Sequence, residues 1–494
     1  MEYDLGWVVF TALLGGIVGI YGFLKKANEW FYVSSLGEKQ KTLPPGDMGW
    51  PFIGNILSFL RAFKNGDPDS FIASFATRFG QARVYRAFMF GNPTIIVTTP
   101  ETCRKVLMDD EHFGPGWPKS VTALFGKKAL HGVSIQEHKR LLRLTAAPIK
   151  GHEALSVYLD YIKHIAKTSF DEWASMEQPI EFITEMRKIT FKVIMTIFMS
   201  SEVDPRSMKA MEKEYTQLCH GHKAMTINLP GFAYHRAIKA RKNLIKLFQA
   251  VVDERRTMIK SNQSKAKKDM LDLMIETEDD DGRKLSDEEI IDLIIAYLFA
   301  GHESSAHAAT WTIIFLQKHP QFFKTAKEEQ EEIIRRRPPT ETGLSLKEIR
   351  QMEYLSKVID ETLRLANLSF VLFREARTDV SINGYNIPKG WKVLAWIRHI
   401  HMNPEIYPNP REFNPSRWDD RRTKPGGYIP FGAGSRLCPG ADLAKLEVSV
   451  FLHYFLLDYK LELLNPGCGV TYLPIPRPSD NCLARITKIS KSTA

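Results

Sequence analysis

One of the five cysteines stands in a loop suited to holding a reactive sulfur. Cys438 lies in the segment FGAGSRLCPG, and a helix is expected to begin near Ala441. Backbone N–H groups of a glycine-rich loop and the positive end of a helix dipole both stabilise an anionic sulfur. A thiolate is a strong axial ligand for haem iron and favours cleavage of the O–O bond. The loop therefore predicts a haem-thiolate site. A buried free thiol is the alternative, and is our interpretation of Cys103, Cys219, Cys468 and Cys482.

Other side chains are placed to fix this loop and its cofactor. Phe431 can pack beside the sulfur, and Arg436 can pair with a haem propionate because a guanidinium binds carboxylates bidentately. Upstream, Glu361 and Arg364 are three residues apart, a spacing that puts both charges on one face of a helix. Taken alone, Glu361 and Arg364 would be interpreted as a surface ion pair.

A long buried helix should carry further site residues. Ser286 and Glu289 fit a capping box, and no proline follows until Pro320, so a helix of about 30 residues is expected. Its stretch IIDLIIAYLFA is apolar nearly all round, which is typical of a buried helix. Gly301 lowers helix stability, and the Ser304 hydroxyl can bond to a carbonyl four residues back and open the helix locally.

The rest of the chain indicates a mainly α fold with small β-sheets. Long amphipathic runs dominate residues 55–350, whereas DVSINGYNIPKGWKVLAWI alternates apolar and polar residues around the hairpin turn Asn383-Gly384. No internal repeat or second domain boundary is apparent. We therefore assign residues 55–494 to one catalytic domain and residues 27–54, which include LPPGDMGWPFIGN, to a linker and proline-rich hinge.

The N-terminus predicts a membrane anchor. Residues 5–24 carry no charge over 20 positions, and about 20 such residues span the hydrocarbon core as a helix. Glu2 and Asp4 make the preceding flank acidic, unlike the basic flank of a cleaved signal peptide. Lys25 and Lys26 follow directly and favour a cytosolic C-terminal side. Residues 1–26 are therefore assigned to a retained single-pass anchor.

Composition narrows the function classes. The cysteines are odd in number and show no paired spacing, which favours a reducing compartment, and the absence of CxxC and HExxH patterns gives zinc no support. The net charge is +10, but the basic residues are scattered, so we expect no nucleic-acid partner. A basic face that meets an acidic protein or an anionic membrane fits this balance better.

The cysteine loop resembles the FxxGxRxCxG signature of cytochromes P450, with matches at Phe431, Gly434, Arg436, Cys438 and Gly440. Glu361 and Arg364 resemble that family's ExxR motif, and Arg417 in PSRW resembles the third member of its Glu-Arg-Arg triad. The resemblance implies the cytochrome P450 fold with an N-terminal transmembrane helix and a haem b cofactor. It also implies a monooxygenase that uses O2 and electrons from NADPH through NADPH–cytochrome P450 reductase.

The resemblance further implies roles for individual residues. Glu303 and Ser304 would be the catalytic pair that helps to deliver protons to bound dioxygen. Arg374 and His138 would join Arg436 at the haem propionates; the alternative for Arg374 is an exposed arginine at a strand start. An arginine expected at position 142 is replaced by Leu142, so Arg143 is a second candidate. The triad of Glu361, Arg364 and Arg417 would clamp the fold and position the haem loop.

Four segments narrow the resemblance to the plant ent-kaurenoic acid oxidase family and its triterpenoid-oxidising relatives. They are LPPGDMGWPFIGN, INLPGFAYHRAIKARK, INGYNIPKGWKV and FGAGSRLCPGADLAKLE. This resemblance implies the endoplasmic reticulum membrane as the location, with the catalytic domain facing the cytosol. Departures from the oxidase pattern occur at Phe299, Ala306 and LANLSFVLF. We therefore take Phe299, Ala300, Leu368 and Phe370 as candidate walls of the substrate pocket, against the alternative of plain core packing.

Three functions remain open. The first is oxidation of a triterpenoid in specialised metabolism, and the second is ent-kaurenoic acid oxidation in gibberellin biosynthesis. The third is a membrane-anchored haem protein that does not oxygenate; retention of Glu303 and Ser304 argues against it. An acid substrate should require a cation or several donors in the pocket, and none is identified in the sequence. Similarity over the whole chain favours the second function, whereas the departures at the pocket favour the first, and we favour the first.

Overall fold

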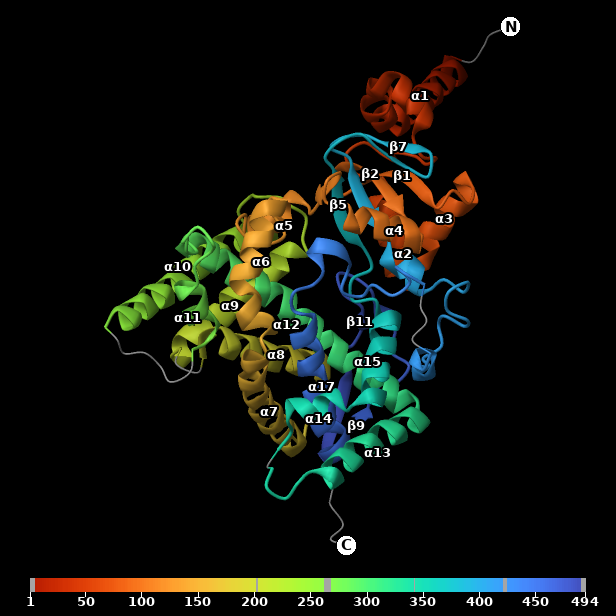
Figure 1. Cartoon of the computed structure of the whole chain (residues 1–494). Coiled ribbons are helices and arrows are strands. Elements are labelled where there is room, and N and C mark those ends of the chain that lie inside the picture. The colour runs from red at the N-terminus through yellow and green to blue at the C-terminus, as the bar shows by residue number, and fades with distance from the viewer. Residues whose placement is uncertain (1–4, 201–202, 262–267, 342, 421–423, 490–494) are drawn as a thin grey trace. The chain divides into compact units, whose positions relative to one another are not determined.

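The computed structural model describes the chain except for residues 1–4, 201–202, 262–267, 342, 421–423 and 490–494. The fold is mainly α-helical with small β-sheets, as predicted (Figure 1). The chain divides into two compact units, and residues 55–494, which were assigned to one catalytic domain, are shared between them. The first contains Met1–Gly116, Phe370–Asn403 and Pro425–Gly427, and the second contains Trp117–Ser369, Pro404–Lys424 and Tyr428–Ala494.

The first unit is built on a five-stranded sheet of order β1-β2-β8-β5-β3. Only β2 and β8 pair in parallel; the other neighbours are antiparallel. Helices α2, α3, α4 and α16 belong to this unit, and the rings of Phe59, Phe63, Phe71, Phe370 and Trp396 form an aromatic cluster within it. The strands are β1 (Val84–Met89), β2 (Asn92–Val97), β3 (Phe113–Pro115), β5 (Leu372–Ala376) and β8 (Lys392–Ala395); the helices are α2 (Ile56–Lys64), α3 (Asp69–Phe79), α4 (Pro100–Met108) and α16 (Ile397–His401).

Two local predictions can be compared with this unit. Strands β6 (Val380–Ile382) and β7 (Tyr385–Ile387) pair around Asn383 and Gly384, which have φ values of 52° and 81°, so the hairpin turn is confirmed. The segment assigned to a hinge instead packs on β1. Gly46 pairs with Arg86, and a Cβ at Gly46 would lie 2.1 Å from the Arg86 carbonyl oxygen, so only glycine allows this approach.

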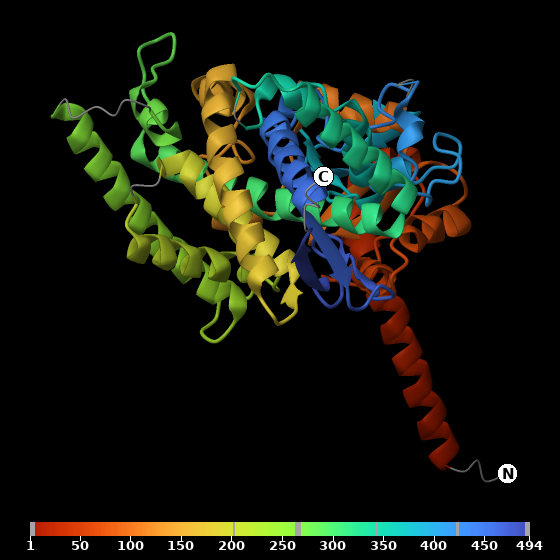
Figure 2. The same ribbon diagram turned by 90° about the horizontal axis from the view of Figure 1, so that it is seen from below.

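The N-terminal segment forms one continuous helix, α1 (Leu5–Tyr32), drawn in red in Figure 2, and η1 (Ser34–Thr42) follows it. Trp7, Phe10, Leu13 and Phe23 on α1 each expose more than half of their surface. As far as the helices are described, none has an apolar stretch long enough to cross a membrane.

The second unit is arranged around the long helix α12 (Asp287–Lys318). Ser286 and Glu289 form the predicted capping box, and the helix runs for 32 residues before Pro320 begins the next one. It packs against α8 (Phe182–Met199), α15 (Glu353–Ala366) and α17 (Ala441–Asp458) (Figure 1). Its buried side chains join the large hydrophobic core of the unit, as expected for a helix that is apolar nearly all round.

The other elements of the second unit surround this centre. The helices are α5 (Lys119–Phe125), α6 (Ile135–Lys150), α7 (His152–Ser175), α9 (Pro205–His222), α10 (Ala233–Lys260), α11 (Met270–Glu276), α13 (Pro320–Arg336), α14 (Leu346–Arg350), η3 (Pro415–Trp418) and η4 (Gly434–Arg436). One sheet has the order β4-β12-β9 and another pairs β10 with β11. These strands are β4 (Ile180–Glu181), β9 (Tyr459–Leu463), β10 (Val470–Thr471), β11 (Arg477–Pro478) and β12 (Leu483–Lys488).

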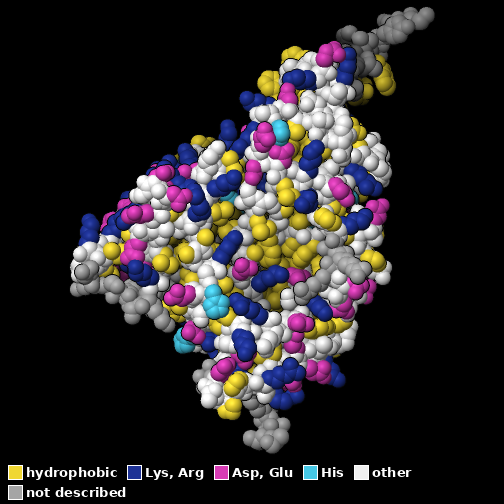
Figure 3. All heavy atoms as spheres, in the orientation of Figure 1, with side chains coloured by type: hydrophobic (Ala, Val, Ile, Leu, Met, Phe, Trp, Pro, Cys, Tyr) yellow, Lys and Arg dark blue, Asp and Glu magenta, His cyan; other side chains and the backbone are white. Residues whose placement is uncertain are grey.

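Charged side chains of both signs are mixed on the surface. Figure 3 shows lysine and arginine side chains interspersed with aspartate and glutamate over the visible face rather than gathered in one stripe. Many are engaged in ion pairs, such as Arg256 with Asp287 and Lys445 with Asp360.

Candidate active site

The cysteine loop has the geometry expected of a sulfur cradle. Cys438 follows η4 and precedes α17, so its sulfur lies near a helix N-terminus. Its backbone N–H donates to the Phe431 carbonyl at 2.9 Å, and Gly432 and Gly434 adopt φ values of 81° and 75°. Burial raises the pKa of the Cys438 thiol, and a hydrogen bond from the Gly440 N–H lowers it in part. A cationic partner is therefore needed to hold the sulfur as a thiolate.

The donor set of this loop fits a haem better than a bare metal ion. In the described part of the chain, no three His, Cys, Asp or Glu side chains group closely enough to hold a metal. Cys438 supplies a single soft sulfur, which suits haem iron because the porphyrin provides the in-plane ligands. Ser435 beside it has a buried hydroxyl with no hydrogen-bond partner among the described residues. A cofactor against this loop would give that hydroxyl a partner.

Arg436 ties the cysteine loop to the segment before α6. Its two terminal nitrogens donate to the carbonyls of Leu130 and Val133 at 2.9 and 3.1 Å. These bonds fix the guanidinium beside the sulfur loop, where it was expected to meet a propionate.

Helix α6 carries the other cationic candidates. His138 is buried, whereas Arg143 is 65 % exposed and pairs with Asp280 at 2.6 Å. Arg140 is also buried, but three carboxylates already bind it: Glu137, Asp279 and Glu289. The structure therefore gives Arg143 a different partner and leaves His138 as the α6 residue suited to a buried cofactor.

The predicted Glu-Arg-Arg triad is assembled in the structure. The carboxylate of Glu361 receives two bonds from Arg364, at 2.7 and 2.8 Å, and one from Arg417 at 3.1 Å. Glu361 and Arg364 have no exposed side-chain surface. Their burial excludes the surface ion pair that the spacing alone would indicate. Arg364 and Arg417 also donate to the backbone carbonyls of Pro410 and Asn409, so the triad fixes the coil between α15 and the cysteine loop.

A second tie links α15 directly to the cysteine loop. Asp360, next to Glu361, accepts bonds from the Tyr428 hydroxyl at 3.0 Å and the Lys445 ammonium at 2.7 Å. Tyr428 precedes the loop and Lys445 lies in the second turn of α17. Both ends of the loop are therefore bound to α15, the helix that carries Glu361 and Arg364.

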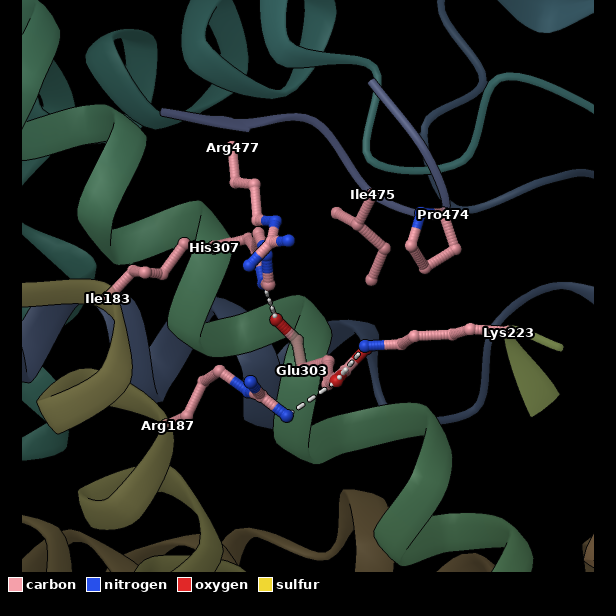
Figure 4. Close-up of a pocket in the computed structure, with 8 residues that line it drawn as sticks. All are labelled: Ile183, Arg187, Lys223, Glu303, His307, Pro474, Ile475 and Arg477. Carbon is pink, nitrogen blue, oxygen red and sulfur yellow. Dashed lines mark hydrogen bonds and ion pairs between the residues drawn. The ribbon is translucent and has the colours of Figure 1, made fainter. Parts of the chain in front are cut away.

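Ser304 and Glu303 are neighbours on α12 with different surroundings. The Ser304 hydroxyl donates to the Ala300 carbonyl at 2.6 Å, the bond expected from the sequence. Glu303 is buried and binds Arg187 at 2.7 Å and Lys223 at 2.9 Å, as Figure 4 shows. Burial alone would raise the pKa of Glu303, but the charges of Lys223 and Arg187 outweigh it and lower the pKa to about 2.

A small pocket opens beside Glu303 (Figure 4). Its lining residues are Ile183, Arg187, Lys223, Glu303, His307, Pro474, Ile475 and Arg477. Burial lowers the pKa of His307 to about 4, so its imidazole is neutral at pH 7. No sequence motif marks Arg187 and Lys223, which are far from Glu303 in the chain, and sequence reasoning missed them.

The four candidate pocket walls fall in different places. Phe299 stacks on Phe125 of α5 with ring centroids 3.6 Å apart, and Ala300 beside it is exposed. Leu368 is half-buried against the core of the second unit. Phe370 belongs to the first unit, where it contacts Phe63 and Trp396, so core packing accounts for it.

Arg374 also belongs to the first unit. Its side chain is buried, and it donates to the carbonyls of Phe373 and Leu107. The alternative of an exposed arginine is therefore wrong.

Comparison with known proteins places the chain in a family. The cytochrome P450 family model matches residues 44–472. The chain is 55 % identical to 7,8-epoxymelianol synthase of Ailanthus altissima, covering 99 % of this chain and 98 % of that protein. It is 56 % identical to ent-kaurenoic acid oxidase 1 of Arabidopsis thaliana, and the match covers 99 % of this chain and 100 % of that protein. Among solved structures, the retinoic acid-bound cyanobacterial CYP120A1 matches with a TM-score of 0.79 and 27 % identity over 90 % of this chain and 99 % of that one.

The chain belongs to the cytochrome P450 family, and its fold is the helical P450 fold with small sheets. It is a haem-thiolate monooxygenase of that family rather than a haem protein that does not oxygenate. The resemblance to ent-kaurenoic acid oxidases and their triterpenoid-oxidising relatives is confirmed by the identities of both groups over nearly the whole chain.

Replacing Glu361 tests the buried triad. Glu361→Gln keeps the shape but leaves Arg364 buried without its counter-charge, so we expect a loss of about 3–5 kcal/mol in the free energy of unfolding. Urea denaturation and haem content per protein measure this loss. Glu38→Gln is the control, because its pair with Lys41 is largely exposed and should matter little. Equal stability of the two variants would contradict the clamp.

The ion pairs of Glu303 predict a specific pH dependence. Because folding lowers its pKa from 4.5 to about 2, the stabilisation is complete above pH 4.5 and is lost as the pH falls toward 2. The free energy of unfolding of the wild type should therefore exceed that of Glu303→Gln by roughly 3 kcal/mol at pH 7. This difference should shrink below pH 4.5. Urea denaturation between pH 7 and pH 3 measures it. Glu328→Gln, at an exposed and loosely paired site, is the control. A difference that does not change with pH would refute the assignment.

Proposed function

We propose that this protein hydroxylates or successively oxidises an unactivated carbon of a polycyclic plant terpenoid, and that the terpenoid is a triterpenoid of specialised metabolism. The activities for which its relatives are named support both a triterpenoid and ent-kaurenoic acid as substrates, at 55 % and 56 % identity. Oxidation of ent-kaurenoic acid in gibberellin biosynthesis is therefore the second candidate. The side chains beside Ala300 favour the first.

The observation that carries this choice is an aromatic cluster next to the open face of α12. Phe299 stacks on Phe125, and the ring of His222 lies edge-on to Phe299 with ring centroids 5.0 Å apart. Burial lowers the pKa of His222 to about 4, so the cluster carries no charge at pH 7. A wall of this kind favours neutral apolar surface.

Two cations near this cluster, Lys223 and Arg241, are bound to carboxylates. Lys223, next to His222, binds Glu303. Arg241 contacts the Leu124 carbonyl and binds the buried Asp292 at 2.5 Å. A substrate carboxylate here would have to displace one of these pairs, and removing a partner from a buried pair is costly. A neutral substrate avoids that cost.

We assign the cofactor residues as the sequence predicts. Cys438 would supply the sulfur ligand of the iron of haem b, Phe431 would pack beside that sulfur, and Arg436, His138 and Arg374 would bind the propionates. When bound, the haem supplies reductive activation of dioxygen and oxygen insertion into a C–H bond.

We assign proton delivery to Ser304 and Glu303. The Ser304 hydroxyl lies on the half-exposed side of α12, where it donates a hydrogen bond to the Ala300 carbonyl. Glu303 lines the adjacent pocket, where its ion pairs with Arg187 and Lys223 keep it ionised at pH 7.

The cellular setting follows from the N-terminus and the family. We propose that residues 5–24 anchor the protein in the endoplasmic reticulum membrane, with the catalytic part in the cytosol, because they are uncharged and Lys25 and Lys26 follow. Electrons would come from NADPH–cytochrome P450 reductase in the same membrane.

Removing the sulfur tests the iron ligand. In Cys438→Ala we expect the reduced, carbon monoxide-bound protein to lose the absorption band of a thiolate-ligated haem, because no other side chain offers sulfur in this loop. Cys482→Ala, which removes a buried free thiol elsewhere, should keep the band. A normal thiolate band in Cys438→Ala would overturn the assignment.

Product analysis tests the function. Yeast carrying this chain and a plant reductase would receive ent-kaurenoic acid, and a parallel culture would make common triterpene skeletons. We expect the diterpene acid to remain and a new oxygenated triterpenoid to appear by mass spectrometry. Conversion of the acid through a hydroxylated intermediate to a gibberellin precursor would instead establish the second candidate.

A further inference from the structure

The segment between α5 and α6 is held from two sides. On one side, the Lys128 N–H donates to the Asp292 carboxylate on α12 at 3.0 Å. On the other, Arg436 of the cysteine loop binds the carbonyls of Leu130 and Val133. His131 lies between these anchor points, so its backbone is fixed between α12 and the cysteine loop.

The imidazole of His131 is half-buried, and its Nε2 edge is the buried one. Its Nε2 has no partner among the described residues, and its ring meets Trp117 edge-on with centroids 6.4 Å apart. Burial lowers its pKa to about 4, so the ring is neutral at pH 7. A buried polar atom normally has a partner, because leaving it unbonded costs free energy. Water, the haem or a bound substrate can supply this partner, and the surrounding side chains distinguish between them.

The surroundings indicate what kind of molecule this is. The charges that face His131 are Asp292, Arg241 and Arg436. Asp292 and Arg241 neutralise each other in their ion pair. Arg436 is already bound to the backbone on both sides of His131. Phe125, directly before this segment, belongs to the uncharged aromatic cluster with Phe299. The site thus offers a neutral imidazole beside apolar walls.

We propose that His131 is a specificity-determining residue whose Nε2 forms a hydrogen bond with a neutral oxygen of the terpenoid, such as a hydroxyl, carbonyl or epoxide. The proposal rests on the function proposed above and deepens it. It assigns the pocket one uncharged polar contact, which selects oxygenated neutral skeletons over hydrocarbons and acids. No sequence motif singles out His131, because a histidine in a loop carries none.

The test is ligand titration of the haem-loaded protein. The two probes are melianol and ent-kaurenoic acid. Melianol is chosen because two relatives are named as 7,8-epoxymelianol synthases. The change in the haem absorption spectrum on binding gives Kd for the wild type, His131→Leu and His131→Asn. His319→Leu is the control, because His319 caps the far end of α12 and bonds to the Phe315 carbonyl. Haem content per protein is measured for each variant.

We expect melianol to bind the wild type more tightly than the acid does. His131→Leu should raise Kd for melianol about tenfold, as expected for loss of one hydrogen bond, at unchanged haem content. His131→Asn, which keeps a donor and an acceptor, should recover part of the affinity, and His319→Leu should leave it unchanged.

The opposite outcomes are distinct. An unchanged Kd in His131→Leu would overturn the role of His131 while leaving the proposed function intact. Loss of haem from that variant would also overturn it, since His131 would then bind the cofactor. Binding of the acid but not melianol to the wild type would contradict the proposed function itself.

Discussion

The carboxylate of Glu361 has no contact with solvent, and five hydrogen bonds converge on it from Arg364, Arg417, Trp418 and the Asn414 backbone. A charge in that position is tolerated only while its partners stay in place. This requirement fixes the coil after Pro408, and the neighbouring Asp360 fixes both ends of the cysteine loop through Tyr428 and Lys445. The position of the Cys438 sulfur therefore depends on a buried network that lies outside the loop itself.

Helix α12 separates two environments by one residue. Ser304 bonds to the helix backbone and remains half-exposed, whereas Glu303 points to two cations and a small pocket. One turn earlier, Phe299 closes an uncharged aromatic cluster with Phe125 and His222. The same helix thus positions an ionised acid, a hydroxyl and an apolar wall, and ion pairs neutralise Lys223 and Arg241 beside that wall. This separation is the physical basis for favouring a neutral substrate.

Much of this arrangement could be predicted from sequence because its signals are local. The capping box at Ser286, the Asn383-Gly384 turn and the cysteine loop each depend on residues close together in the chain. The i,i+3 spacing of Glu361 and Arg364 is also local, but Arg417 joins them only by resemblance to a family. Contacts between distant residues were not predictable. Glu303 meets Arg187 across 116 positions, and the proline-rich segment near Gly46 packs on β1 because glycine allows close approach to Arg86.

The central claim is that an ent-kaurenoic acid oxidase-like scaffold has a pocket tuned for a neutral triterpenoid. Direct competition tests it most directly: holoenzyme, plant reductase and NADPH with equal concentrations of melianol and ent-kaurenoic acid, and the product ratio by mass spectrometry. We predict at least about a tenfold excess of oxygenated melianol, which corresponds to roughly 1.4 kcal/mol between the two transition states. A product mixture dominated by the oxidised diterpene acid would contradict the account.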